Sequence, residues 1–368
     1  MRIDLNSIDV LKNTITYNYT ADTEAEIFFD KSHKFFIEYQ TEIDFTNVPD
    51  SVLAIPFVTN LLPLCLIYDV TLTVNDIDKD FYKSIDDIKK GFVKVYPEVE
   101  LKGEFIAKNI VNNAYEVSDK TTCLFSGGVD ATFTFLRHRK EKPVLFNVWG
   151  VDISLDDVQG HDETQQYFIK LAKAFDTSYI CIKSTLRKFL NESYLNTKTY
   201  EIIKDYWWHG AQHSIGLLSL LAPYNYINKI KTNYIASTFT QTELDQGVKC
   251  ASYPIIDNAL VMASTKVVHD GFDYARIDKI KYICSTCKEE NYTVDLKVCF
   301  HYINGKNCSA CEKCFRTIAA ILVYDTDVEK YGFKLKKPNA PELRRFLDTH
   351  EIGLFRWIPI QNAYTYRR

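Results

Sequence analysis

Hydrophobic and polar positions from residue 121 onward follow two alternating patterns. Short apolar runs suited to buried strands are separated by longer segments whose apolar residues recur at helical spacing. Strands that alternate with helices predict an α/β domain built around a parallel sheet. The expected strands are Thr122–Phe125, Pro143–Trp149, Ser178–Ile182 and Thr232–Ser237, and the expected helices are Asp130–Arg137, Gly160–Phe175 and an interrupted one at Tyr200–Leu221.

The first 117 residues show a more mixed pattern. We predict an N-terminal α+β extension at 1–117 that ends in the polar stretch 112–120. It serves either as a structural cap or as a module that binds a partner or substrate. Within it, the hydrophobic stretch Ile55–Tyr68 is expected to break at Pro56 and Pro63. Other expected elements are strands at Ile27–Phe29, Lys34–Tyr39 and Val70–Val74, and a helix from Ser84, its N-cap, to Val95.

A glycine-rich turn separates the first core strand from the first core helix. It reads Ser126-Gly127-Gly128-Val129-Asp130 and is followed by Thr132. Adjacent glycines let the backbone turn sharply and approach a ligand closely, and the unpaired N–H groups of the helix start favour an anion such as phosphate. Ser126 and Thr132 add hydroxyl donors, and Asp130 can hold Mg²⁺ between phosphate oxygens. The alternative is a turn that only closes the strand onto the helix.

Four cysteines near the C-terminus have the spacing Cys299-x8-Cys308-x2-Cys311-x2-Cys314. Four thiolates at this spacing form a closed tetrahedral zinc site, so we predict a structural Zn²⁺ ion at 299–314 followed by a helix. A redox role for Cys311 and Cys314 is the alternative. The chain has ten cysteines and no secretory signal at its start, which favours metal binding in a reducing cytoplasm over disulfides.

Two further stretches carry candidate chemistry. Residues 275–283 predict a helix with isoleucines on its inner face, where Lys279 reads on its own as a solvated lysine. Trp207-Trp208-His209 is either a platform on which a base stacks or a buried helix seam.

Composition narrows the set of partners. The 368-residue chain has a formal net charge of −4, which argues against nucleic acid or an anionic membrane as a partner. The longest apolar runs, around Leu61–Tyr68 and Ile215–Ala222, are too short to span a bilayer. We therefore expect a cytoplasmic protein with no membrane contact, and a homodimer is left open.

The turn and the cysteines together resemble a known family. Ser126–Asp130 resembles the Ser-Gly-Gly-x-Asp-Ser signature of the PP-loop ATP pyrophosphatases, with Ala131 where that family usually has serine. With the cysteine spacing, residues 121–325 resemble the 7-cyano-7-deazaguanine synthase (QueC)-like branch. The resemblance implies a Rossmann-like, adenine nucleotide alpha hydrolase-like PP-loop domain at 118–325 with a C-terminal zinc knuckle. The tail 326–368 is expected to pack on this core.

The same resemblance implies an activity. QueC-like enzymes use ATP and Mg²⁺ to adenylate the carboxylate of 7-carboxy-7-deazaguanine, releasing pyrophosphate before an amine attacks. It implies a late lysine reaching the phosphates, a role that falls on Lys279, so Asp130 and Lys279 become the catalytic candidates. The turn from Ser126 to Asp130, with Thr132, would then bind ATP. The family's substrate loop has its nearest match at Ser252–Asp257. The family's Pro-Gly-Arg-Asn motif has its nearest match at Gly210–His213. The resemblance therefore implies that the deazaguanine-type substrate meets His213, Tyr253 and Asp257.

The extra N-terminal residues make the chain resemble the extended QueC-like proteins of anti-phage defence operons of the type IV CBASS or Qat type. That resemblance implies an operon partner protein whose N-terminus replaces ammonia as the attacking amine. Ammonia-dependent 7-cyano-7-deazaguanine synthesis, a tRNA-modifying PP-loop enzyme and an inactive nucleotide-binding module are the alternatives.

Overall fold

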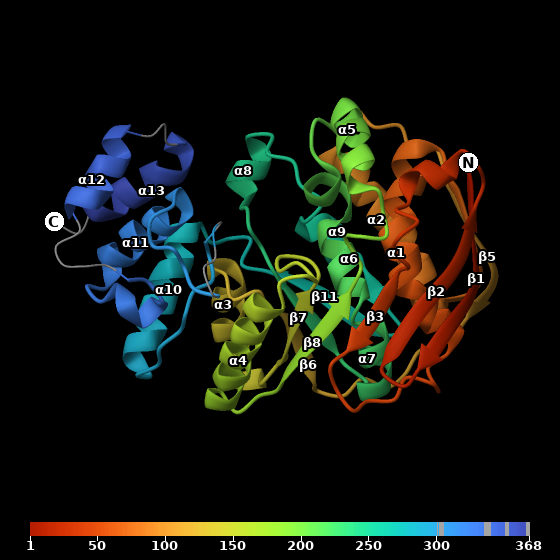
Figure 1. Cartoon of the computed structure of the whole chain (residues 1–368), viewed down its shortest axis with the longest axis horizontal. Coiled ribbons are helices and arrows are strands. Elements are labelled where there is room, and N and C mark those ends of the chain that lie inside the picture. Colours follow the sequence, from red (N-terminus) through yellow and green to blue (C-terminus); the bar gives the residue numbers. More distant parts are fainter. Residues whose placement is uncertain (300, 302–304, 335–339, 350–352, 366–368) are drawn as a thin grey trace.

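A computed structural model describes residues 1–299, 301, 305–334, 340–349 and 353–365. In this part of the chain one eleven-stranded sheet runs through the molecule in the order β10-β11-β9-β6-β7-β8-β3-β2-β1-β4-β5 (Figure 1). Most neighbouring strands are parallel, so the α/β class is confirmed and the sheet is compatible with a Rossmann-like domain. The strands are β1 Arg2–Leu11, β2 Thr14–Ala21, β3 Phe36–Tyr39, β4 Thr71–Asp78, β5 Glu104–Val111, β6 Thr121–Leu124, β7 Val144–Trp149, β8 Tyr179–Ser184, β9 Thr232–Ala236, β10 Val261–Met262 and β11 Thr265–Asp270.

The order of the parallel strands creates a switch point beside β6. The chain passes from β6 to β7 and β8 on one side, then returns to β9 and β11 on the other. Loops leaving β6 and β9 therefore separate at the carboxyl ends of these strands, where open α/β sheets bind their ligands. The glycine turn that follows β6 lies at this point.

Helices cover both faces of the sheet. Alternate residues of β7 point to opposite sides: Leu145 joins the apolar cluster under α3, α4, α10 and α11, whereas Phe146 and Val148 join the one under α1, α6 and α7. The helices are α1 Asp50–Tyr68, α2 Lys79–Val95, α3 Val129–His138, α4 Val158–Ala174, α5 Glu192–Ile203, α6 His213–Ser219, α7 Ala222–Asn228, α8 Gln241–Asp245, α9 Pro254–Asp257, α10 Arg276–Glu289, α11 Glu312–Tyr324, α12 Ala340–Thr349 and α13 Leu354–Thr365.

The N-terminal residues continue the same sheet. β3 pairs antiparallel with β8, and β2, β1, β4 and β5 follow outward to the sheet edge (Figure 1). Their apolar residues share one cluster with those of α6, α7 and β11. The expected strand at Ile27–Phe29 is wrong, because Ala25–Phe28 forms a 3₁₀ turn, and the helix expected from Ser84 begins at Lys79 with Asp78 as its N-cap.

The stretch expected to break at its prolines forms a continuous helix, α1, with Pro56 and Pro63 inside it. Tertiary burial outweighs the local cost of proline here, since nearly every side chain of α1 is buried. The expectation that no apolar run is long enough to span a membrane is also wrong, because α1 meets that length and composition. Its spanning window is 94% buried inside the protein, as in the core helix of a globular domain.

The C-terminal helices gather at the end of the molecule opposite β1 and β5 (Figure 1). Trp357 and Ile360 of α13 are buried in the apolar cluster that also contains α3, α10 and α11. Parts of the expected tail at 335–339, 350–352 and 366–368 lie outside the described residues.

Candidate functional site

Hydrogen bonds within the turn after β6 fix the shape of its backbone. Gly127 has a φ of +75°, which only glycine adopts readily, and a Cβ there would come within 2.9 Å of Lys297 and Phe168 side chains. The Gly128 N–H donates to Ser126 Oγ at 3.3 Å, and Thr132 Oγ1 donates to the Gly127 carbonyl at 3.4 Å. Gly128 then caps α3 without a side-chain hydrogen bond. This arrangement leaves a helix start that can receive an anion.

Two cations meet the acidic residue of this turn. Asp130 Oδ2 accepts from Arg276 Nη2 at 2.5 Å, and Asp130 Oδ1 accepts from Lys279 Nζ at 3.1 Å. Lys279 also donates to the carbonyl of Ser237, just after β9, on the other side of the switch point. Its side chain is 1% exposed, so the alternative of a solvated lysine is wrong. Burial raises the pKa of Asp130, but Arg276 and Lys279 outweigh it and hold that pKa below its usual value.

Two more cations, Lys313 and Arg316, lie on α11, the helix that begins at the last two cysteines. Burial lowers the pKa of Lys313, and Arg276 and Arg316 lower it further, whereas Asp152 and Asp130 oppose them. Burial also lowers the pKa of Arg316, to about 10, with Arg276 acting in the same direction. Lys313 and Arg316 therefore share one electrostatic environment with Asp130.

The sequence interpretation missed Arg276, Lys313 and Arg316. The signal that could have found them is spacing. Arg276 precedes Lys279 by three positions on α10, and Lys313 precedes Arg316 by three on α11, so each pair shares a helix face.

The predicted zinc ligands come together. The Sγ atoms of Cys299, Cys308, Cys311 and Cys314 all lie within 4.8 Å of one another, so the four cysteines could hold one metal ion. The pairs Cys299–Cys311 and Cys308–Cys314 are each 3.9 Å apart, close to the ~3.8 Å edge of a tetrahedron with Zn–S bonds of ~2.3 Å.

Backbone amides around the cluster favour thiolates over thiols. The N–H groups of His301 and Cys308 donate to Cys299 Sγ at 3.1 and 3.3 Å, and those of Ala310 and Cys311 donate to Cys308 Sγ. Donors aimed at sulfur stabilise its negative charge. The donor set therefore fits a closed zinc site. Residues 300 and 302–304, between the ligands Cys299 and Cys308, lie outside the described residues.

A second group of side chains surrounds His213. Arg187 lies over the ring of Trp208 at 4.7 Å, and Trp208 meets His213 edge to face at 5.2 Å. His213 Nδ1 is buried without a hydrogen-bond partner, and burial lowers the pKa of His213.

Of the two alternatives for the tryptophan pair, a buried helix seam describes Trp207 and a stacking platform suits Trp208. Trp207 is fully buried and donates from Nε1 to Gln212 Oε1 at 2.7 Å, as expected for a helix seam. Trp208 is only partly buried and faces Arg187 and His213. A planar heterocycle could contact Trp208 but not Trp207.

The remaining substrate candidates are engaged in internal contacts. Tyr253 donates to the carbonyl of Val248 at 2.6 Å. Asp257 is fully buried and accepts from Ser214 Oγ and Ser252 Oγ, and its Oδ2 lies 2.7 Å from His269 Nδ1. These contacts fix α9 against β11, and they leave His213 as the candidate with an unpaired polar atom.

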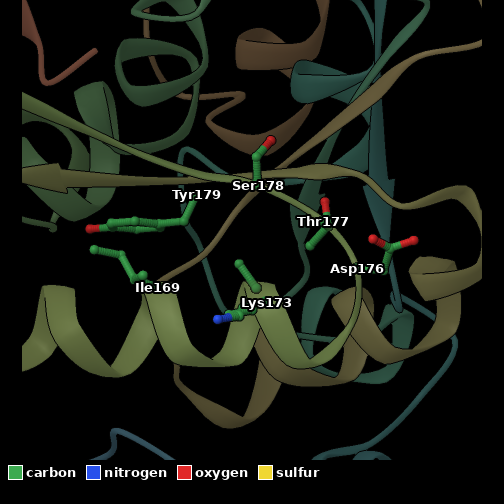
Figure 2. A pocket seen from close by; sticks show the side chains of 7 residues that line it. Ile169, Lys173, Asp176, Thr177, Ser178 and Tyr179 are labelled. Atoms are coloured by element: carbon green, nitrogen blue, oxygen red, sulfur yellow. The ribbon is translucent and has the colours of Figure 1, made fainter.

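A surface depression of about 290 Å³ lies at the end of the sheet where β8 begins, opposite the carboxyl ends of the parallel strands (Figure 2). Ile169, Lys173, Asp176 and Tyr179 line it, between the end of α4 and the start of β8. Strand starts are not where open α/β sheets bind ligands, and the depression lies away from the glycine turn.

No protein-family model, curated protein or solved structure matches the chain. The arguments below therefore rest on the residues and on their geometry.

Proposed function

We propose that the protein is an ATP-dependent ligase that activates the carboxylate of 7-carboxy-7-deazaguanine or a close analogue. One observation carries the proposal. Two cations of α10, Arg276 and the buried Lys279, pair with Asp130 of the glycine turn, at the switch point of a mostly parallel sheet. A polyphosphate is the ligand that such a turn and such a charge distribution favour.

The reaction needs little from side chains beyond charge and position. The carboxylate oxygen attacks the α-phosphorus of ATP, the bond to the β-phosphate breaks, and the products are an acyl adenylate and pyrophosphate. An amine then attacks the acyl carbon, and the amide, AMP and a proton are released. Lys279 and Arg276 stabilise the charge that develops on pyrophosphate as it leaves.

Both carboxylate oxygens of Asp130 accept hydrogen bonds from cations, one from Arg276 and one from Lys279. Asp130 holds Lys279 and Arg276 in place for the phosphates. The magnesium role stays a prediction, and the steps above do not depend on it.

A second group of side chains supports the part of the proposal that concerns the deazaguanine-type substrate. It consists of His213, Trp208 and Arg187. A buried, unpaired ring nitrogen beside an aromatic face suits a planar nitrogen heterocycle, which a deazaguanine is. The amine is ammonia or the N-terminus of an operon partner protein. Mass spectrometry of a co-expressed operon partner, with wild type and Asp130→Ala, tests the second; a partner unmodified in both excludes it.

Pyrophosphate release from ATP with 7-carboxy-7-deazaguanine tests the ligase itself. We expect release that requires both substrates and is lost in Lys279→Met but kept in Lys281→Met, whose side chain is exposed on the same helix. ATP binding without release would favour the second candidate, a nucleotide-binding module without turnover. Ala131 favours that candidate, because it puts a methyl group where the family has a hydroxyl.

A further inference from the structure

The two edges of the sheet differ in length. β10, at one edge, has 2 residues, and so short a strand offers little backbone for pairing. β5, at the other edge, has 8 residues, and β4 is its one neighbour among the described strands (Figure 1). No proline or glycine interrupts β5. Its outer edge therefore presents a row of backbone groups that no other described strand pairs.

The backbone register shows which groups of β5 face outward. The Glu104 N–H donates to the Val70 carbonyl at 3.1 Å, and β4 and β5 keep one parallel register along the strand. Successive residues of a strand direct their N–H and C=O groups to opposite edges. The groups of Phe105 and Ala107 therefore point away from the sheet, whereas those of Ile106, between them, point toward β4.

Apolar side chains are exposed on both faces of this edge. Ile106 and Ile110 are 38% and 49% exposed on one face of β5. On the other face Tyr82 of α2, 38% exposed, lies against Phe105 with ring centroids 6.1 Å apart. Exposed apolar side chains beside outward backbone groups favour pairing with another strand.

The two charged residues of β5 are spaced to pair with a second copy of the strand. Glu104 and Lys108 share the exposed face with Ile106, which lies midway between them. A two-fold axis through Ile106 sets two copies antiparallel, with Glu104 of each opposite Lys108 of the other. Phe105 then lies opposite Ala107, and their outward groups exchange hydrogen bonds. The charged pair occupies positions that are not hydrogen-bonded across the two strands, where side chains approach most closely.

Neighbouring antiparallel registers lose this match. An axis through Ala107 sets Lys108 opposite Ile106, and an axis through Lys108 sets two lysines against each other. A lysine on an edge strand discourages such pairings, but Glu104 neutralises it in the register centred on Ile106. Lys108 donates to Asn75 Oδ1 at 2.9 Å, which keeps its ammonium over the exposed face of the sheet. The remaining donors of the ammonium can still meet a carboxylate.

We propose that the protein forms a two-fold symmetric homodimer in which β5 pairs antiparallel with β5 of a second copy, centred on Ile106. One sheet then continues through both chains. Neither the glycine turn nor the cysteine cluster takes part, so this proposal does not rest on the proposed function.

Sedimentation equilibrium over a series of protein concentrations measures the self-association. We expect wild type to form dimers. Lys108→Glu and Glu104→Lys each turn two attractive cross-strand pairs into two repulsive ones, so each should weaken self-association roughly tenfold or more. A mixture of the two variants makes both pairs attractive again and should dimerise as wild type does. Lys281→Glu, at an exposed position of α10, is the matched control and should change nothing.

Ala107→Pro tests the backbone pairing. An edge strand tolerates proline where the lost N–H points away from its neighbour, but the hydrogen bond to a second copy is lost. We therefore expect this variant to be monomeric, and thermal unfolding shows whether each variant keeps the fold. If Ala107→Pro does not fold, the charge variants and their mixture decide, since the side chains of Glu104 and Lys108 are exposed.

Two results would overturn the homodimer. Wild type that stays monomeric at every concentration excludes it and leaves the edge for a strand of a different protein. A dimer that Lys108→Glu, Glu104→Lys and Ala107→Pro all leave unchanged also excludes it, because another surface then holds the two chains together. Pyrophosphate release is measured separately, so neither result bears on the ligase proposal.

Discussion

Replacing Lys279 with methionine should damage both the fold and the phosphate site. The Nζ–Oδ1 distance to Asp130 is 3.1 Å, for which Coulomb's law with an effective dielectric constant of 20 gives about 5 kcal/mol. Desolvation of the buried ammonium offsets part of this, and breaking a buried pair costs about 3–5 kcal/mol. Arg276 still pairs with Asp130, so we expect about 3 kcal/mol of lost stability, at the low end of that range.

Urea unfolding measures this loss, and calorimetry with pyrophosphate measures the loss of binding. A charged contact worth about 1.5–3 kcal/mol corresponds to roughly 10- to 100-fold weaker pyrophosphate binding by Lys279→Met. Lys281→Met is the matched control, because it removes the same group from an exposed position of the same helix, where changes stay within about 0.5 kcal/mol. Equal stability and equal affinity of the two variants would refute the reasoning.

Three further predictions test the site and its surroundings. Asp130→Asn should keep or strengthen pyrophosphate binding without Mg²⁺, because it removes a negative charge from an anion site; calorimetry with and without Mg²⁺ shows whether Asp130 also serves the metal. Burial alone would lower the pKa of His138, but Asp270 and Glu141 outweigh it and raise that pKa above 6.5. Urea unfolding should therefore show His138→Gln less stable than wild type at pH 6, with the difference shrinking as the pH rises through the raised pKa. Elemental analysis should find one zinc per chain in wild type and less in Cys311→Ser, with about 3 kcal/mol or more of lost stability.

Local patterns in the sequence predicted the site better than they predicted the fold around it. The strand, turn and helix around Gly127 follow from adjacent residues, and the cysteine cluster follows from spacing. Both depend on short stretches of chain, so neighbours far away in sequence had little chance to alter them.

Elements that depend on distant partners were predicted less well. Pro56 and Pro63 read as breaks, yet α1 runs through both because the sheet and α6 bury it on all sides. Lys279 read as solvated because a single residue shows no burial, and only the fold brings Asp130 and the Ser237 carbonyl to it. The pairing of β3 with β8, which makes one sheet out of both halves, has no local signal either.

The pairing of Asp130 with two cations explains why a carboxylate belongs in a site for phosphate. Lysine and arginine lose about 2 kcal/mol of rotamer entropy each when a ligand must order them. Asp130 reduces that cost, since its ion pairs with Arg276 and Lys279 fix both side chains as the protein folds. When phosphate arrives, the cations exchange or share an acceptor instead of becoming ordered for the first time. Asp130 therefore weakens binding through its charge and favours it through preorganisation. We expect the charge effect to be the larger, so Asp130→Asn should keep or strengthen pyrophosphate binding, and weaker binding by that variant would show that preorganisation dominates.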